Sequence, residues 1–109
     1  MLISTMGKGE ILVDKSLVVK QDRYVAKIKV YQVAKSKIFP FGIKAKFLLH
    51  DLINDCARLL VDNHEPFGFH MHTKLPDNPT ERMKLEVEDY NEALQIFFNE
   101  VERILKNEE

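Results

Sequence analysis

The chain of 109 residues contains one cysteine, and its uncharged hydrophobic runs are only a few residues long. Because Cys56 has no second cysteine to pair with, an intrachain disulfide and a cysteine-based metal site are both excluded, which is consistent with a reducing compartment. A membrane-spanning helix needs roughly 20 apolar residues, and no apolar signal segment opens the chain. We therefore expect a cytoplasmic protein that does not enter the membrane.

Internal repeats, low-complexity tracts and Gly/Ser-rich linkers are also missing from the sequence. With 45% hydrophobic residues, a chain of this length can form one modest core, which would bury roughly two thirds of the unfolded surface. We therefore expect residues 1–109 to form a single domain.

The formal net charge of -1 conceals two halves of opposite sign. Residues 1–50 carry ten Lys/Arg against three Asp/Glu, whereas residues 51–109 carry six against fourteen. Such asymmetry is typical of a basic surface that meets an anionic partner, with an acidic segment that stays solvated or faces a basic protein. The alternative is that the two halves simply neutralise each other on folding.

Alternation of apolar and polar residues predicts most of the strands. Residues 23–34 and 43–49 each place apolar side chains on one face and basic side chains on the other. Residues 11–19 predict a bent strand or a short strand pair, with a break at 14–16. The lysines on the polar face of the two clearest strands are Lys27, Lys29, Lys44 and Lys46.

Residues 48–60 fit a helical stripe as well as a hairpin, and the turn-prone pair at 54–55 favours the hairpin. Residues 57–62 then form its second strand. Residues 69–75 predict a further strand in which His70, His72 and Lys74 share one face, and residues 83–87 predict a short one.

The last segment has the features of an amphipathic helix. Asp89 is placed to cap its N-terminus, and Glu92 stands where a capping-box partner belongs. The apolar stripe comprises Tyr90, Leu94, Phe97, Val101, Ile104 and Leu105. We therefore predict an α+β fold of two layers, an antiparallel β-sheet of about five or six strands with a C-terminal α-helix packed on one face.

Three of the four histidines fall between positions 64 and 72, directly after an Asp-Asn pair. Histidine titrates near neutral pH and is the commonest metal ligand, so this cluster indicates proton transfer or metal binding. The candidate catalytic residues are Asp62, His64, His70 and His72. A structural turn is expected at Asn63, Pro66 and Gly68.

Histidines beside a basic sheet face are typical of a metal-independent ribonuclease. Such an enzyme needs a base, an acid and cations that stabilise the charged phosphorane, and it needs no cofactor. An exposed aromatic ring, Tyr31 or Phe67, would stack on an unpaired base. The candidate phosphate or RNA-binding residues are Lys27, Lys29, Lys44, Lys46 and Lys74.

Two other interpretations remain open. His64, His70 and His72 could instead bind a divalent metal such as zinc, because a His-x-His pair on a strand points two imidazoles the same way. Alternatively, these residues are solvated strand positions beside a tight turn, and the protein is a non-catalytic binding or regulatory partner.

Residues 59–64, followed by a Pro/Gly turn and His70-Met71-His72, resemble the Asp-Asn-His and His-x-His signature of the TumE-like toxins of prokaryotic type II toxin–antitoxin modules. Residues 39–44 and 90–105 are similar to other parts of that family, and the resemblance runs from residue 39 to the end. It implies a small toxin that is neutralised by a cognate antitoxin protein. RNA is the candidate target by analogy with other small toxins, and a homodimer is a candidate assembly.

Overall fold

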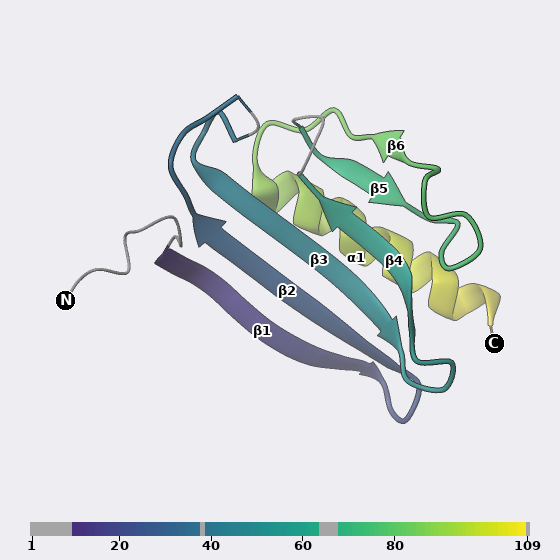
Figure 1. The fold of residues 1–109 in the computed structure, drawn as a ribbon. Coiled ribbons are helices and arrows are strands. Elements are labelled where there is room, and N and C mark those ends of the chain that lie inside the picture. The colour runs from purple at the N-terminus through teal and green to yellow at the C-terminus, as the bar shows by residue number, and fades with distance from the viewer. Residues whose placement is uncertain (1–9, 38, 64–67, 109) are drawn as a thin grey trace.

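The computed structural model describes residues 10–37, 39–63 and 68–108, which form a six-stranded sheet and one helix. The strands are all antiparallel and lie in chain order, and the helix packs on one face over the middle of the sheet (Figure 1). The predicted two-layer α+β fold is therefore confirmed. The elements are β1 (Glu10–Lys20), β2 (Tyr24–Gln32), β3 (Ile43–Asp51), β4 (Cys56–Asp62), β5 (His70–His72), β6 (Met83–Lys84) and α1 (Tyr90–Asn107).

The alternation of residue types along β2 and β3 determines which face of the sheet is buried. From Tyr24 to Val30 and from Ala45 to Asp51, every second residue is fully or almost fully buried on the face that α1 covers, while the intervening lysines are exposed on the opposite face, here called the open face. At the centre of the core, the ring of Phe47 lies 5.9 Å from that of Phe97 on α1. Other core residues are Ala26, Ile28, Val30, Leu49, Leu59, Val61, Met71, Val101 and Ile104.

The hairpin, and not the helical stripe, is the structure of residues 48–60. β3 and β4 pair in antiparallel register, and the chain reverses between Asp51 and Cys56. Asp51 stabilises the turn because its carboxylate accepts hydrogen bonds from the backbone N–H of Ile53 at 3.0 Å and of Asn54 at 3.1 Å. Bonds from Asn54, chiefly from its side chain, hold the pKa of Asp51 below its ordinary value although the group is buried.

Several boundaries differ from those expected. β1 is one continuous strand with two irregularities in its pairing, so the strand-pair alternative is wrong. β5 ends at His72, and Lys74 lies instead in the following turn, where its carbonyl accepts a hydrogen bond from the N–H of Asn78 at 2.7 Å. Two prolines in this segment, Pro76 and Pro79, have no N–H to donate, so the strand cannot continue as a ladder.

The terminal helix begins as predicted. Asp89 is the N-cap, and its side chain accepts a hydrogen bond from the N–H of Glu92 at 3.0 Å. The Glu92 carboxylate bonds to the N–H of Glu88, one residue before the group that a capping box would use. The buried stripe includes Ala93 in addition to the expected Phe97. Within the described part of the chain, no helix has both the length and the apolar character needed to cross a bilayer.

Asn63 ends β4 and extends its pairing with β3 through a side chain. Its Oδ1 accepts a hydrogen bond from the N–H of Ala45 at 2.9 Å, and its Nδ2 donates to the carbonyl of Ile43 at 2.7 Å. The carboxamide therefore satisfies two backbone groups of β3 in the way a peptide group of a longer β4 would. The turn expected at Asn63 continues into residues 64–67, which lie outside the described residues, so the turn stays a prediction.

We predict that Asn63→Ala lowers the free energy of unfolding by about 1–3 kcal/mol, because it leaves one donor and one acceptor of β3 without partners in a buried place. Urea unfolding measures the change. Asn99→Ala is the matched control, since Asn99 is an exposed helix residue that accepts one bond from Gln95, and it should cost less than about 0.5 kcal/mol. Equal costs for the two variants would contradict the prediction.

Candidate functional site

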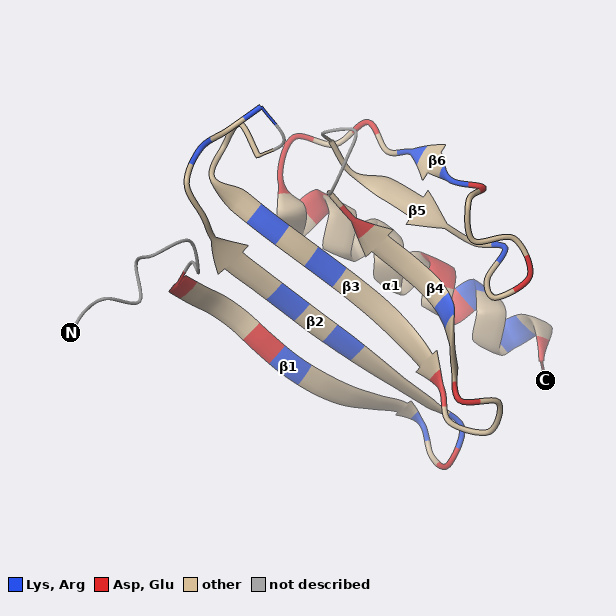
Figure 2. Cartoon of the chain, in the orientation of Figure 1, with Lys and Arg blue, Asp and Glu red and all other residues tan. Residues whose placement is uncertain are grey.

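Strand register brings ionisable residues from all six strands into one row across the open face. Residues directly opposite each other in antiparallel strands lie on the same face, so each member of the row is a neighbour of the next. Figure 2 marks basic positions in blue on β2, β3 and β6 and acidic positions in red on β1 and β4. The row runs Asp14, Lys29, Lys46, Asp62, His70 and Lys84.

The other predicted lysines are not neighbours of the histidines. Lys27 shares a row with His72, but Leu48 and Leu60 lie between them. With strands about 4.8 Å apart, this separation is about 14 Å. Lys44 lies opposite Tyr31, beyond the last residue of β4 that pairs with β3. The open face therefore has a lysine block on β2 and β3 and a histidine pair on β5, joined through Lys46 and Asp62.

His70 lies below the surface and has a lowered pKa. Only 5% of the residue is exposed, and burial is the largest cause of the shift. The positive charge of Arg82 lowers the pKa further, whereas the carboxylate of Asp62 opposes the change. Within the described chain, Nδ1 of His70 has no hydrogen-bond partner. The imidazole is therefore neutral at neutral pH.

His72 is the more accessible imidazole of β5. Its Nδ1 lies 3.0 Å from the carbonyl oxygen of Pro79, and a carbonyl can only accept, so Nδ1 carries the proton. This bond fixes the tautomer of the neutral ring and leaves Nε2 as its unprotonated nitrogen. His72 is half-buried, so part of the residue is in contact with solvent.

Lys84 is the cation that the sequence analysis did not identify. It lies directly opposite His70, and its charge and that of Arg82 both act on the His70 imidazole. The predicted Lys74 is in the turn after β5 and is not part of the row. No periodic pattern reveals Lys84, because its strand contains two residues.

The remaining predicted site residues are His64, Pro66 and Gly68. Gly68 has φ +99°, in the left-handed region that glycine favours, as a turn requires. His64 and Pro66 lie outside the described residues, as does Phe67. Among the residues described, no three His, Cys, Asp or Glu side chains are grouped so that they could hold a metal ion. The zinc alternative needs His64 and stays a prediction.

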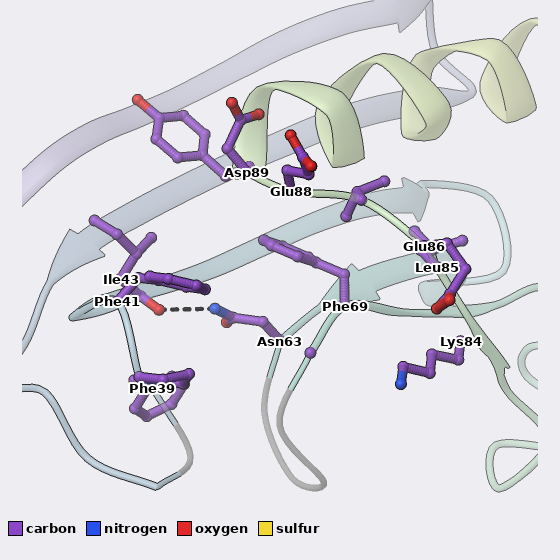
Figure 3. A pocket seen from close by; sticks show the side chains of 14 residues that line it. Phe39, Phe41, Ile43, Asn63, Phe69, Lys84, Leu85, Glu86, Glu88 and Asp89 are labelled. Atoms are coloured by element: carbon purple, nitrogen blue, oxygen red, sulfur yellow. Dashed lines mark hydrogen bonds between the residues drawn. The ribbon is translucent and has the colours of Figure 1, made fainter.

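An aromatic pocket of about 790 Å³ lies beside the sheet, between the start of β3 and the N-terminus of α1. Figure 3 shows Phe41, Phe69 and Asn63 around it, with Glu88 and Asp89 at one side and Lys84 at the other. Phe41 is 80% exposed, which is unusual for so large an apolar ring. The aromatic residues that line the pocket are Phe39, Phe41, Phe69 and Tyr90, and its acidic lining residues are Glu86, Glu88 and Asp89.

A tight turn holds two of these rings in place. Gly42 has φ +71°, and a side chain at this position would come within 2.9 Å of the Val33 carbonyl oxygen. The N–H of Gly42 bonds to the carbonyl of Phe39 at 2.9 Å. The sequence places the Phe-Pro-Phe-Gly turn and the acidic run at 86–89 more than forty residues apart, so only the folded chain reveals the pocket.

A second cavity, of about 890 Å³, lies near the C-terminus of α1 and is polar. Two of its lining residues, Arg23 and Asp51, lie 3.4 Å apart, and Arg23 also lies 3.8 Å from Glu108. Tyr24 donates a hydrogen bond to the same Glu108 carboxylate. This network ties the end of α1 to β2, so we assign it a structural role.

No protein-family model, no curated protein and no solved structure matches this chain.

The pH dependence of stability tests the environment of His70. The pKa of His70 is near 6.5 in the unfolded chain and lower in the folded chain. As the pH falls, the unfolded state therefore binds a proton at a higher pH than the native state does. This contribution to stability is fully present above about pH 6.5 and is lost as the pH falls through the folded pKa. We predict that His70→Gln shows a smaller loss of unfolding free energy between about pH 7.5 and about pH 5.5 than the parent.

Urea unfolding at the two pH values gives this loss for each protein. Comparing the loss, and not the absolute stability, removes the packing cost of the substitution because that cost is common to both conditions. An equal or larger loss in His70→Gln would show that His70 is not the group responsible.

Proposed function

We propose that this chain is the toxin of a toxin–antitoxin pair and that it acts on RNA through the open face of its sheet. The observation that carries the proposal is the direct apposition of Lys29 and Lys46 on β2 and β3. Like charges directly opposite each other destabilise a sheet. A polyanion that binds this face would remove the repulsion and release counterions.

The lysine block is available to such a ligand. Its four members, two on each of two neighbouring strands, are all exposed. Among the described residues, none of them takes part in an ion pair. Tyr31, opposite Lys44, is half-buried on the same face and offers a ring on which a base can stack. An open antiparallel sheet with basic and aromatic side chains suits single-stranded RNA.

The histidine pair supports a cleavage step. His72 would transfer protons at the substrate through Nε2, since its Nδ1 is held by Pro79. The cations nearest to the pair, Arg82 and Lys84, would stabilise negative charge on the phosphorane. His70 is too buried to contact RNA directly, so we assign it a supporting role between Asp62 and Lys84 in the row. His64 remains a predicted catalytic residue.

The cellular context follows from the resemblance in residues 59–72 to TumE-like toxins. A toxin directed at RNA would act in the cytoplasm and would be neutralised there by a cognate antitoxin protein. The acidic second half of the chain gives such a partner a surface that differs in charge from the lysine block.

The function is tested with two variants of the open face. Lys29→Gln with Lys46→Gln should weaken binding to a single-stranded RNA oligonucleotide and reduce the slope of log K against log salt by about 1.4, or about 0.7 for each lost phosphate contact. His72→Ala should keep its RNA affinity but lose the ability to arrest growth when the protein is expressed without an antitoxin. Fluorescence anisotropy measures the first effect and a growth assay the second.

Lys35→Gln with Lys106→Gln is the matched control, because it removes two exposed lysines that lie outside the lysine block. Equal RNA affinity and salt slope in the two double variants would show that the open face is not the RNA surface. Undiminished growth arrest by a folded His72→Ala variant would show that the protein does not use this imidazole for catalysis.

The aromatic pocket favours a second candidate function, the binding of a cationic group from a protein partner. Aromatic faces attract organic cations, and the carboxylates of Glu86 and Glu88 add opposite charge at the rim. Asp89 also lines the pocket, but its carboxylate already caps α1. Only Lys84 opposes this charge among the described lining residues. An arginine or lysine side chain of a basic peptide matches this chemistry.

We predict that N-acetyl-arginine amide produces saturable shifts in the ring signals of Phe41, Phe69 and Tyr90 by nuclear magnetic resonance. N-acetyl-norleucine amide, which is neutral, should produce none. Glu86→Gln with Glu88→Gln should weaken the arginine effect by about threefold or more, as expected for two exposed charge interactions. Asp77→Asn with Glu102→Gln removes two exposed acidic groups elsewhere and should change nothing. Equal shifts from both probes would exclude a cation site.

A further inference from the structure

β1 is a long edge strand whose outer side has no neighbour among the described residues. Its eleven residues pair only with β2, and the outward-facing N–H and C=O groups are left for another strand. The opposite edge of the sheet is much shorter, because β6 contains two residues. A long free edge of this kind is a ready template for pairing with a second chain.

The side chains of β1 are unusually apolar for an exposed edge. Leu12 is 43% exposed, Leu17 is 42% exposed and Val18 is 70% exposed, and Ile11 is more than half exposed as well. The helix covers β3 and β4 and does not reach over this strand (Figure 1). Exposed apolar side chains near both ends of one free edge strand are typical of an interaction surface.

The sequence of β1 is close to a palindrome in chemical type. Three apolar residues, 11–13, precede the polar residues 14–16, and three more apolar residues, 17–19, follow. Glu10 stands at one end and Lys20 at the other. If two copies of the strand pair antiparallel with Lys15 at the centre, residues 11–13 of one copy lie opposite residues 17–19 of the other. Glu10 then lies opposite Lys20 of the partner subunit.

We propose that β1 pairs antiparallel with β1 of a second copy of this chain, centred on Lys15, so that one sheet continues through both copies. This register overlaps the whole strand and places Leu12 opposite Val18 of the partner subunit. In the regularly alternating stretch from Val13 to Leu17 it also keeps residues related by a two-fold axis perpendicular to the sheet on the same face, and the two irregularities of the β1–β2 pairing lie outside that stretch. A heterologous partner strand would have no need for the near-palindrome.

One contact opposes this pairing. Lys15 faces Lys15 of the partner subunit across the axis, and directly opposed like charges destabilise a sheet. The dimer is therefore reversible, and it strengthens when salt screens this repulsion. The two-fold axis keeps both open faces on the same side, so the two lysine blocks belong to one continuous surface.

Sedimentation velocity of the full chain over a range of concentrations tests the pairing. The parent should show a monomer–dimer equilibrium. Leu12→Lys with Val18→Lys should shift it to monomer, because lysines then face each other twice, and Leu12→Glu with Val18→Lys should restore the dimer through opposite charges. Leu52→Lys with Ile53→Lys is the matched control, since both side chains are exposed in the β3–β4 turn, and it should dimerise like the parent.

Disulfide cross-linking in a Cys56→Ser background tests the register. Lys15→Cys should form a disulfide-linked dimer, because directly opposite Cα atoms lie about 5 Å apart. Ser16→Cys should not, since the two cysteines are then offset along the strands by two residues and their Cα atoms lie about 8 Å apart. A parent that stays monomeric, no rescue by the charge pair, or equal cross-linking at both positions would each overturn the proposal.

Discussion

The packing of α1 against one face of the sheet is the interaction on which the rest of this structure depends. Phe97 contacts Phe47 at the centre of that interface, and the alternate residues of β2, β3 and β4 are buried around them. Because side chains alternate between faces, a shift of one residue in the pairing of β2 or β3 would bury lysines and expose the core. The helix therefore fixes the strand register and, with it, the charged row on the open face.

The register in turn decides what the candidate site can do. Lys46 and Asp62 join the lysine block to His70, and Lys84 comes to lie next to the same histidine from a strand of two residues. Burial makes His70 a neutral group beneath the surface, while the bond to Pro79 leaves His72 with one free nitrogen near solvent. Asn63 belongs to the same short motif, but its side chain bonds to the backbone of β3 and is not part of the row on the open face.

Local patterns predicted the elements that are long and periodic. The strands around Lys27 and Lys44 and the helix capped by Asp89 all have a face that is visible in the sequence. Residues 48–60 were ambiguous because a hairpin between two half-buried strands can imitate a helical stripe, and the Asp51 turn resolves the ambiguity. The strand predicted over 69–75 is longer than β5 because the chain turns after His72, where the carbonyl of Lys74 accepts a hydrogen bond from the N–H of Asn78.

The sequence by itself determined which side chains share a face, since that depends on a two-residue repeat within each strand. It also determined the near-palindrome of β1 and the capping of α1, which are local as well. Only the tertiary structure decided which of the open-face residues are neighbours, how deeply His70 is buried, and that two distant segments enclose an aromatic pocket. These properties depend on strand order and register, which arise from contacts between segments far apart in the chain.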